Sequence, residues 1–397
     1  MAEFHQLPLS GVTVVSIEQA VAAPFATRQL ADLGARVIKV ERPGSGDFAR
    51  QYDTAVHGQS SYFVWLNRSK ESLTLDVKSR QGRAILGRLL AQADVFVENL
   101  APGAAARLGL APSELRDEFP SLIPCSISGY GSSGPWSDRK AYDLIVQCQT
   151  GLVSLTGSGQ ETARVGVSVA DIAAGMYAYS GLLTALYVRA TTGVVRAVEV
   201  SLFEALAEWM SQPAYYTRHS GTQPPRIGTQ HATIAPYGAY ATADGKEILF
   251  SVQNEREWTA LCEQVLERPD LVDDPRFARG PDRVSHRAEL NAIVSERFGR
   301  SDSRQVTKVL DGAGIANAGV NDVEDFLAHP VLRERGRWRE VSIPGAVVPA
   351  LVPPVDLSGT SPRMDAVPDI GGHTDTVLAE LGFTTAEIAA LHAGRVV

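Results

Sequence analysis

Hydrophobic positions near the start of the chain follow two periods, one typical of strands and one typical of helices. Runs of β-branched residues at 11–18 and 35–41 predict two short buried strands. Between them, apolar residues recur at helical spacing from Phe25 to Leu33, and Gly34 is placed to end that helix. A strand, a helix and a strand within about thirty residues predict a right-handed βαβ unit, and therefore a parallel sheet.

The same alternation continues through the first third of the chain. Residues 83–92 have the pattern of a helix, whereas 94–100 and 122–131 have the pattern of strands. This order predicts the α/β fold class. No G-x-G-x-x-G follows the first strand, so the dinucleotide-binding fingerprint is absent there. The sequence SIEQAVAAP occupies that corner instead, and its small residues leave room for a ligand to approach the backbone.

The pattern changes in the second half of the chain. A long apolar helix is predicted from about 170 to 190, and another over 203–219. After a linker rich in Pro, Gly and Thr, Asp244 and Gly245 predict a hairpin turn, and mostly helical sequence follows to about 330. We therefore expect two domains: 1–224 and 331–397 form a large one, and 225–330 form a small one.

Composition and charge narrow the class of protein. Hydrophobic residues make up 44% of the 397 residues and charged residues 21%, as in soluble globular proteins. The net charge of −8 disfavours a nucleic-acid partner. Charges, Gly or Pro interrupt each apolar run, so no membrane span is expected, and the N-terminus lacks the features of a secretory signal. Cys125, Cys148 and Cys262 are widely spaced, which indicates neither a disulfide framework nor a zinc site and favours a reducing cytoplasm.

Basic residues nevertheless gather in one region. Arg42 closes the second predicted strand, and a group of cations follows shortly after it, namely Arg68, Lys70, Lys78, Arg80 and Arg83. Any one of them is most simply a solvated surface charge. As a group they favour a ligand that carries phosphates.

Asp171 is the one carboxylate within the apolar stretch VGVSVADIAAGMYA at 165–178. It precedes a long helix, where an Asp is favoured as the N-cap. A carboxylate held there by backbone N–H groups is also able to attack an activated carbonyl if water is excluded. The residues themselves leave both roles open, and one residue can fill both.

Other candidate residues are less specific. Glu98 and Asn99 end a predicted strand, where ligands bind in α/β sheets, although Glu98 is equally consistent with a rim charge. Asp143 is more consistent with a helix cap than with a catalyst. The eight histidines show no ligand spacing, so no metal site is expected.

The order of several blocks resembles that of the family III coenzyme A transferases, also called the CaiB/BaiF family, over nearly the whole chain. The blocks are LADLGARVIKVERPGSGD, NRSKESLTLDVKSRQGR, ADVFVENLAPGAAARLGL, SISGYGSSGP, AYDLIVQCQTGLVSLTG and VADIAAGMYAYSGLLTAL. The resemblance implies a large Rossmann-like domain built from both chain ends, a smaller inserted domain, and two chains interlocked as a homodimer.

The resemblance also implies a mechanism, because Asp171 matches the family's catalytic aspartate. The carboxylate would attack an acyl-CoA thioester and give an acyl-aspartyl anhydride and free CoA thiolate. The thiolate would then form an aspartyl-CoA thioester, and an incoming carboxylic acid would reverse both steps. Coenzyme A is implied as part of the substrate and product, and neither ATP nor a metal is needed.

Matching positions imply a set of CoA contacts that follows the strand ends. They are Gln19, Ala20, Val21, Ala22, Arg42, Leu75, Lys78, Asn99, Leu100, Arg107, Lys140 and Tyr142. The basic cluster would thus attract a cofactor with several negative charges.

The chain departs from formyl-CoA transferase at two places. The glycine run of that enzyme is replaced by IGTQHAT, and its oxalate-contacting glutamine by Val21, so oxalate and formyl-CoA are not favoured as substrates. His231 and Tyr237, in and after the substituted loop, are placed to contact the distal carboxylate of an acceptor. We expect a dicarboxylic acid of four or five carbons, such as succinate, mesaconate, citramalate or itaconate.

Two alternatives share this fold. An α-methylacyl-CoA racemase also keeps an aspartate at the position of Asp171 but needs a histidine as a second base. This chain has Tyr142 there, and a tyrosine with a pKa of about 10 is poorly suited to proton exchange. The second alternative is a non-catalytic CoA-binding paralogue, which would bind CoA without a covalent intermediate.

Overall fold

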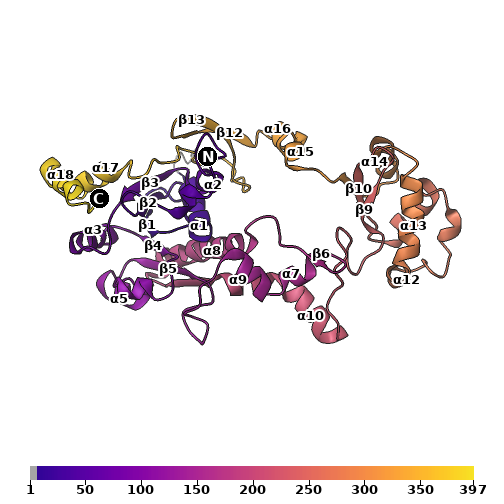
Figure 1. Ribbon diagram of the computed structural model, residues 1–397, viewed down its shortest axis with the longest axis horizontal. Helices are drawn as coiled ribbons and strands as arrows, with labels where there is room; N and C mark the ends of the chain where they lie inside the picture. The colour runs from indigo at the N-terminus through magenta and orange to yellow at the C-terminus, as the bar shows by residue number, and fades with distance from the viewer. Residues whose placement is uncertain (1–6) are drawn as a thin grey trace. The chain divides into compact units, whose positions relative to one another are not determined.

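The computed structural model describes residues 7–397 and divides them into two compact units (Figure 1). The first contains 7–151, 165–211 and 333–397, and the second contains 152–164 and 212–332. The first unit therefore takes segments from both parts of the chain that flank the second.

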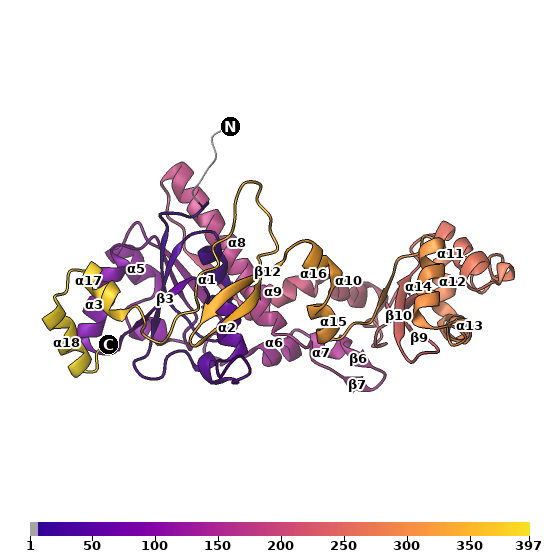
Figure 2. The same cartoon turned by 90° about the horizontal axis from the view of Figure 1, so that it is seen from above.

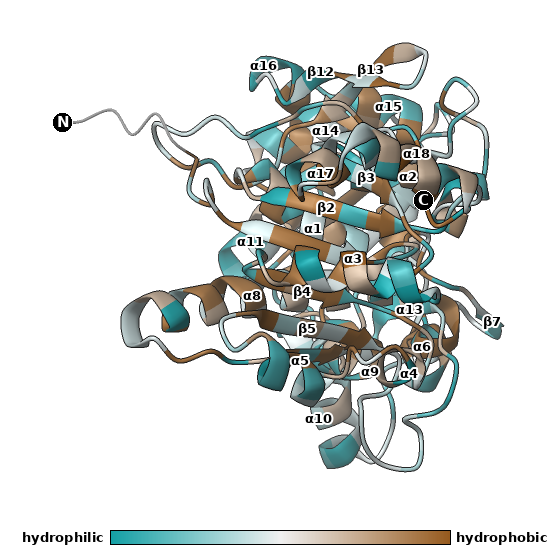
Figure 3. Cartoon of the chain, turned by 90° about the vertical axis from the view of Figure 1, so that its left-hand side faces the viewer, coloured by the Kyte–Doolittle hydropathy of each residue, from teal (hydrophilic) through white to brown (hydrophobic). Residues whose placement is uncertain are grey.

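A six-stranded parallel sheet forms the centre of the first unit, and its strand order is β3-β2-β1-β4-β5-β8. The strands are β1 (Thr13–Ile17), β2 (Arg36–Glu41), β3 (Lys70–Thr74), β4 (Val95–Glu98), β5 (Ile123–Ser128) and β8 (Val198–Ser201). Figure 3 shows much of their length in the brown of hydrophobic residues, as expected for parallel strands covered on both faces. The predicted α/β class is confirmed.

The strand order reverses between β1 and β4, which pair in parallel with Ile17 opposite Glu98. In a doubly wound sheet this reversal leaves a crevice beyond the carboxyl ends of the two strands. Residues 18–20 and 99–101 follow those ends. The sheet topology therefore provides a ligand site before any side chain is considered.

Helices cover both faces of the sheet, as Figure 2 shows. One face is covered by α3 (Arg80–Leu90), α5 (Pro112–Glu118), α17 (Thr374–Glu380) and α18 (Thr385–Ala393), which share a core with Val15, Ile38 and Phe96. On the other face lie α1 (Ala22–Asp32) and α8 (Val169–Thr192). Helix α1 ends as predicted, with Gly34 at a φ of 102° just beyond it.

Further elements of this unit are short. They are η1 (Phe48–Gln51), α2 (Ser61–Asn67), α4 (Ala104–Arg107), α6 (Asp143–Gln149), α9 (Leu202–Trp209) and the hairpin of β12 (Trp338–Ile343) and β13 (Ala346–Leu351). The hairpin packs on Phe63 of α2. Buried Arg68 joins the same region to the first part of the chain, because it donates to Asp32 and to the carbonyl of Leu351.

Helix α8 corrects one expectation, that no apolar run reaches membrane-spanning length. By length and composition it could cross a membrane, and 44% of its most apolar window is buried. Core helices of globular proteins have the same length and composition. Here α8 packs against α1, α6, α9 and strands β5 and β8, which accounts for its apolar composition.

The second unit has its own small sheet and core. Strands β9 (Tyr237–Ala241), β10 (Glu247–Ser251) and β11 (Asn317–Gly319) are antiparallel, and the predicted turn at Gly245 has a φ of 75°. The helical segments around them are α11 (Glu255–Ala260), η2 (Leu261–Val265), η3 (Pro269–Leu271), α12 (Gly280–Ser285), α13 (Arg287–Phe298) and α14 (Ser303–Gly312). Helices α15 (Val323–Leu327) and α16 (Pro330–Glu334) follow along the chain, and the boundary between the units falls within α16.

Two boundaries differ from those drawn from the sequence. The structure groups 152–164 with the second unit, because Ser158 bridges to Ile227 and Arg226 donates to the carbonyl of Ser154. That segment contains α7 (Leu152–Leu155), β6 (Gly157–Ser158) and β7 (Glu161–Thr162). The helix predicted over 203–219 is two helices, α9 and α10 (Ser211–Ser220), since Pro213 has no N–H for the carbonyl one turn back.

The contact between α1 and α8 has no space for a side chain at Gly175. A Cβ there would lie 2.6 Å from the carbonyl oxygen of Ala22 and 3.0 Å from the ring of Phe25. The backbone of α8 is thus packed directly on the start of α1, one turn after Asp171. The glycine fixes how closely the two helices approach.

We predict that Gly175→Ala lowers the thermal unfolding midpoint, because the methyl group forces apart two packed helices at a cost of about 1–3 kcal/mol. Gly87→Ala in the interior of α3 is the matched control, since a Cβ there meets nothing within 4 Å. The control should be stabilised by about 0.5–1 kcal/mol. Equal midpoints for the two variants in thermal melts would contradict the packing argument.

Candidate active site

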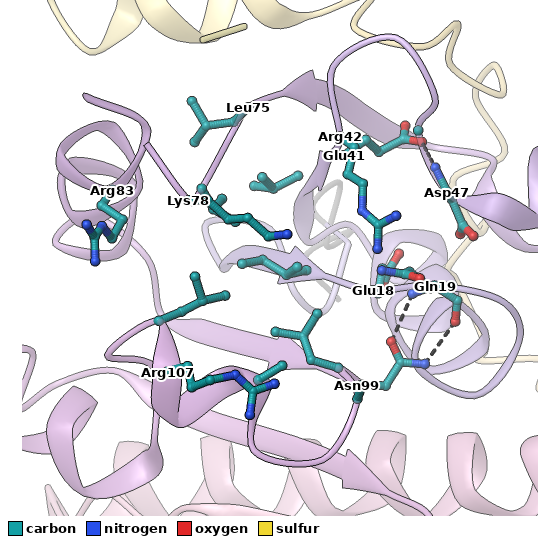
Figure 4. Close-up of a pocket in the computed structure, with 18 residues that line it drawn as sticks. Glu18, Gln19, Glu41, Arg42, Asp47, Leu75, Lys78, Arg83, Asn99 and Arg107 are labelled. Atoms are coloured by element: carbon teal, nitrogen blue, oxygen red, sulfur yellow. Dashed lines mark hydrogen bonds between the residues drawn. The ribbon is translucent and has the colours of Figure 1, made fainter. Parts of the chain in front are cut away.

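A pocket of about 510 Å³ opens beyond the carboxyl ends of β1, β2 and β4 (Figure 4). It lies at the reversal of strand order, where an α/β sheet is expected to bind ligands. The pocket brings together many of the CoA contacts predicted from the resemblance, namely Gln19, Arg42, Leu75, Lys78, Asn99, Leu100 and Arg107. These residues come from four different strand ends or the segments that follow them.

Four basic residues line the pocket. Arg42, Lys78 and Arg107 line it together with Arg83, which was predicted only as part of the basic cluster (Figure 4). Within residues 7–397, none of these four cations forms an ion pair with a carboxylate. Unpaired cations around one pocket favour an anionic ligand such as a phosphate.

Two other members of the basic cluster, Lys70 and Arg68, have a structural role. Lys70 is buried and bonded to Glu18 at 2.7 Å, and Arg68 is buried and donates to Asp32 at 2.8 and 2.9 Å. Arg80 does not line the pocket. The interpretation of these three residues as ligand-binding cations is therefore not supported by where the structure places them.

The loop after β1 is held in place by two side chains from elsewhere. Asn99 accepts from the backbone N–H of Gln19 and donates to its carbonyl, both at 2.8 Å. Asp47 accepts from the N–H of Ala20, which has a φ of 61° and so needs external support. Val21 and Ala22 are buried and, like Ala20, do not line this pocket.

Beneath that loop lies a buried ion network. Lys39 donates to Asp47 at 2.7 Å and lies 3.6 Å from Glu18, whose other neighbour is Lys70. Burial alone would raise the pKa of Glu18, but Lys70 and Lys39 lower it below its ordinary value. Burial lowers the pKa of Lys70 to about 8 in spite of Glu18. The charges balance inside the protein, so the loop rests on a rigid support.

Asp171 differs from the predicted N-cap. Helix α8 begins at Val169, so Asp171 lies in the first turn. The N-terminal donors are taken by Asp143, whose Oδ1 accepts from the N–H of Ala170 at 2.7 Å and that of Asp171 at 3.4 Å. Asp143 is thus a helix cap, as predicted, and the helix that it caps is α8.

Burial raises the pKa of Asp171 to about 7, and the charge of Asp143 acts in the same direction. A half-exposed tyrosine that sequence reasoning missed, Tyr52, lies close enough to interact with Asp171 and Asp47. Burial, then Asp47 and Asp171, raise the pKa of Tyr52 to about 12, so its hydroxyl remains a donor at neutral pH. The sequence signal available for Tyr52 was its position directly after η1, the short helix that Asp47 caps.

The remaining predicted residues lie outside the pocket. Lys140 is exposed, and Tyr142, at 65% exposure, immediately precedes α6. His231 and Tyr237 belong to the second unit, where their rings stack with centroids 5.2 Å apart. Glu98 is buried rather than at the rim and accepts from the N–H of Leu100. No cluster of His, Cys, Asp and Glu suited to a metal ion occurs in residues 7–397.

Comparisons with known sequences and structures identify the family of the chain. The sequence model of CoA-transferase family III matches residues 9–374. The chain belongs to CoA-transferase family III. It is 33% identical to human succinyl-CoA:glutarate CoA-transferase, over 94% of this chain and 86% of the human one. It is 34% identical to acetyl-CoA:oxalate CoA-transferase of Acetobacter aceti, over 89% and 90% of the two chains.

A solved structure supports the same assignment. The crystal structure of a CaiB/BaiF family protein from Brucella suis is 33% identical, with a TM-score of 0.83. The match covers 95% of this chain and all of the other. This family III CoA-transferase therefore shares the six-stranded α/β architecture of its relatives, and the predicted family and enzyme class are confirmed.

The pKa of Asp171 predicts a pH-dependent stability. Because the folded pKa of about 7 exceeds the ordinary value of 3.8, the folded chain holds the proton to higher pH than the unfolded chain. Stability is therefore lost as pH rises from about 4 to 7 and then levels off. At pH 8, Asp171→Asn should increase the free energy of unfolding by about 1–3 kcal/mol and raise the unfolding midpoint. Near pH 4 it should leave both unchanged.

Thermal melts over that pH range check this expectation. Asp117→Asn, on exposed α5, is the matched control and should shift the midpoint equally at both pH values. A constant difference between Asp171→Asn and wild type across the range would contradict the proposed environment of Asp171.

Proposed function

We propose that this family III CoA-transferase moves CoA from an acyl-CoA donor to a free dicarboxylic acid, through covalent intermediates at Asp171. The observation that carries the proposal is the pocket at the strand ends, where Arg42, Lys78, Arg83 and Arg107 have no carboxylate partner within residues 7–397. CoA bears phosphates that such cations bind, and it is a substrate here, so no resident cofactor is required.

The names of the relatives support a dicarboxylic acceptor. The human protein is named for succinyl-CoA and glutarate, and the Acetobacter protein for acetyl-CoA and oxalate. We propose a dicarboxylate of four or five carbons, with His231 and Tyr237 as the residues that contact its distal carboxylate. A neutral or protonated imidazole next to a phenol offers N–H and O–H donors suited to a carboxylate.

The proposed reaction transfers first the acyl group and then CoA to Asp171. An oxygen of the Asp171 carboxylate attacks the thioester carbonyl, the C–S bond breaks, and CoA leaves as a thiolate. The thiolate attacks the aspartyl carbonyl of the anhydride, releasing the first acid and leaving an aspartyl-CoA thioester. The acceptor carboxylate attacks the carbonyl of that thioester, the C–S bond breaks, and an acceptor-aspartyl anhydride and free thiolate form. The thiolate then attacks the acceptor's carbonyl, which gives the new acyl-CoA and releases the Asp171 carboxylate. The raised pKa of Asp171 strengthens the carboxylate as a nucleophile once it is ionised.

Two further features are proposals. We propose an interlocked homodimer, which light scattering would test against a monomer mass. We propose a reducing cytoplasm as the location, a setting consistent with Cys125, Cys148 and Cys262 all being free.

Covalent capture tests the proposed mechanism. After incubation with succinyl-CoA and then hydroxylamine, the intact mass of the wild type should show one modification that peptide mapping places on Asp171. Asp171→Ala should show none, because it lacks the attacking carboxylate. An unmodified wild type that exchanges α-protons of acyl-CoA with deuterated water would instead establish a racemase, and one that binds CoA without either reaction would be a non-catalytic paralogue.

The pocket charges are tested separately. Lys78→Ala and Arg107→Ala should each raise the KM for acyl-CoA about 5- to 30-fold, because each removes a charge-assisted contact worth about 1–2 kcal/mol. The loss should shrink as salt increases. Arg80→Ala is the control, since Arg80 is close in sequence but does not line the pocket. A KM change as large in this control as in the other two would refute the assignment.

A further inference from the structure

We propose that Asp143 and Gln147 form a positioning pair that occupies the first backbone donors of α8 and sets a fixed negative charge beside Asp171, leaving the Asp171 carboxylate free to attack. The inference rests on the proposed function, because it assigns a role within the same covalent mechanism. It concerns residues that contact Asp171 or its helix and not the CoA pocket.

The first step of the argument is competition for donors. An acidic residue in the first turn of a helix ordinarily bonds back to the N-terminal N–H groups. Here Asp143 accepts from the N–H of Ala170 at 2.7 Å and that of Asp171 at 3.4 Å, while Ser168, the N-cap residue, makes no capping bond with its side chain. Within residues 7–397, the Asp171 carboxylate itself accepts no hydrogen bond. The carboxylate therefore lies near the N-terminus of α8 without being hydrogen-bonded to the backbone N–H groups there.

Gln147 fixes the orientation of Asp143. It lies one turn later on α6, is fully buried, and donates through Nε2 to Oδ2 of Asp143 at 2.7 Å. Its Oε1 accepts from the N–H of Val165 at 3.0 Å, on the segment that leads into α8. Both oxygens of Asp143 are therefore engaged, and the amide joins α6 to the start of α8.

The third step is electrostatic. Asp143 is the one charged group of the described residues that raises the pKa of Asp171, in addition to burial. Asp171 also interacts with Tyr52, which in turn interacts with Asp47 and Tyr142. From α1, Arg28 and Asp32 act on Tyr179, two turns further along α8. A carboxylate made more basic by a neighbouring charge is a stronger nucleophile when ionised.

Two variants separate the hydrogen bonds from the charge. In Asp143→Asn, the new amide N–H₂ faces the amide N–H₂ of Gln147, so one contact between them is lost along with the charge. In the double variant Asp143→Asn, Gln147→Glu, the Asn donates to the new carboxylate, which also accepts from Val165. Every hydrogen bond is then restored, and the negative charge is moved from position 143 to position 147, further from Asp171.

The test is the rate at which succinyl-CoA modifies Asp171 covalently between pH 5 and 9, measured together with the midpoint of thermal unfolding. The double variant should melt like the wild type, while its rate profile moves to lower pH by about 0.5–1 unit. Its plateau rate should fall about 3- to 10-fold, as expected for a less basic nucleophile. Asp138→Asn, an exposed carboxylate preceding α6, controls for net charge and should keep the wild-type profile.

A double variant with the wild-type plateau and pH midpoint would overturn the proposal and leave Asp143 a structural cap alone. Should Asp143→Asn fail to fold, the double variant still decides, because its hydrogen bonds are complete. Failure of the proposed function is recognised separately, since the wild type would then show no capture at any pH. If the wild type is modified at Asp171 and the double variant has the same pH profile, only this inference is refuted and the proposed function stands.

Discussion

The buried ion network of Glu18, Lys39, Lys70 and Asp47 is the interaction on which the pocket depends. Glu18 directly follows β1, Lys39 lies within β2, Lys70 begins β3 and Asp47 follows β2, and Asp47 also accepts from the N–H of Ala20 in the turn after β1. Removing one partner would leave an unpaired charge inside the protein, which is far more costly than losing a surface pair. The network therefore fixes Asp47, and Asp47 fixes Ala20 in its left-handed conformation.

Rigid support of this kind matters for a site that binds a large, flexible substrate. The pocket cations are free to contact a ligand because other cations of the same sequence region, Arg68 and Lys70, already neutralise the internal carboxylates. A second support, at the contact of Gly175 with Ala22, joins the helix of Asp171 to the helix that follows the pocket loop. The pocket loop and the helix that carries Asp171 are thereby packed together in the same unit.

The sequence predicted those features that depend on local pattern. Strands β1 and β2, helix α1 and its end at Gly34 follow from hydrophobic periodicity and turn chemistry, and Asp171 follows from its isolation in an apolar stretch together with the family resemblance. Long-range partners were not predictable. Lys70 reaches Glu18 across 52 residues and Asp143 reaches Ala170 across 27, so neighbouring residues show neither the burial of the first nor which helix the second caps.

The composite origin of the first unit has a consequence for how the chain folds during synthesis. Residues 333–397 supply α17 and α18 to the core over one face of the sheet, and they leave the ribosome after the whole second unit. Until then Val15, Ile38 and Phe96 lack part of their cover, whereas most of the second unit comes from one continuous segment. The nascent enzyme thus passes through a stage in which the inserted unit is complete and the sheet against which α8 packs still exposes apolar surface, which is the stage at which a chaperone would bind.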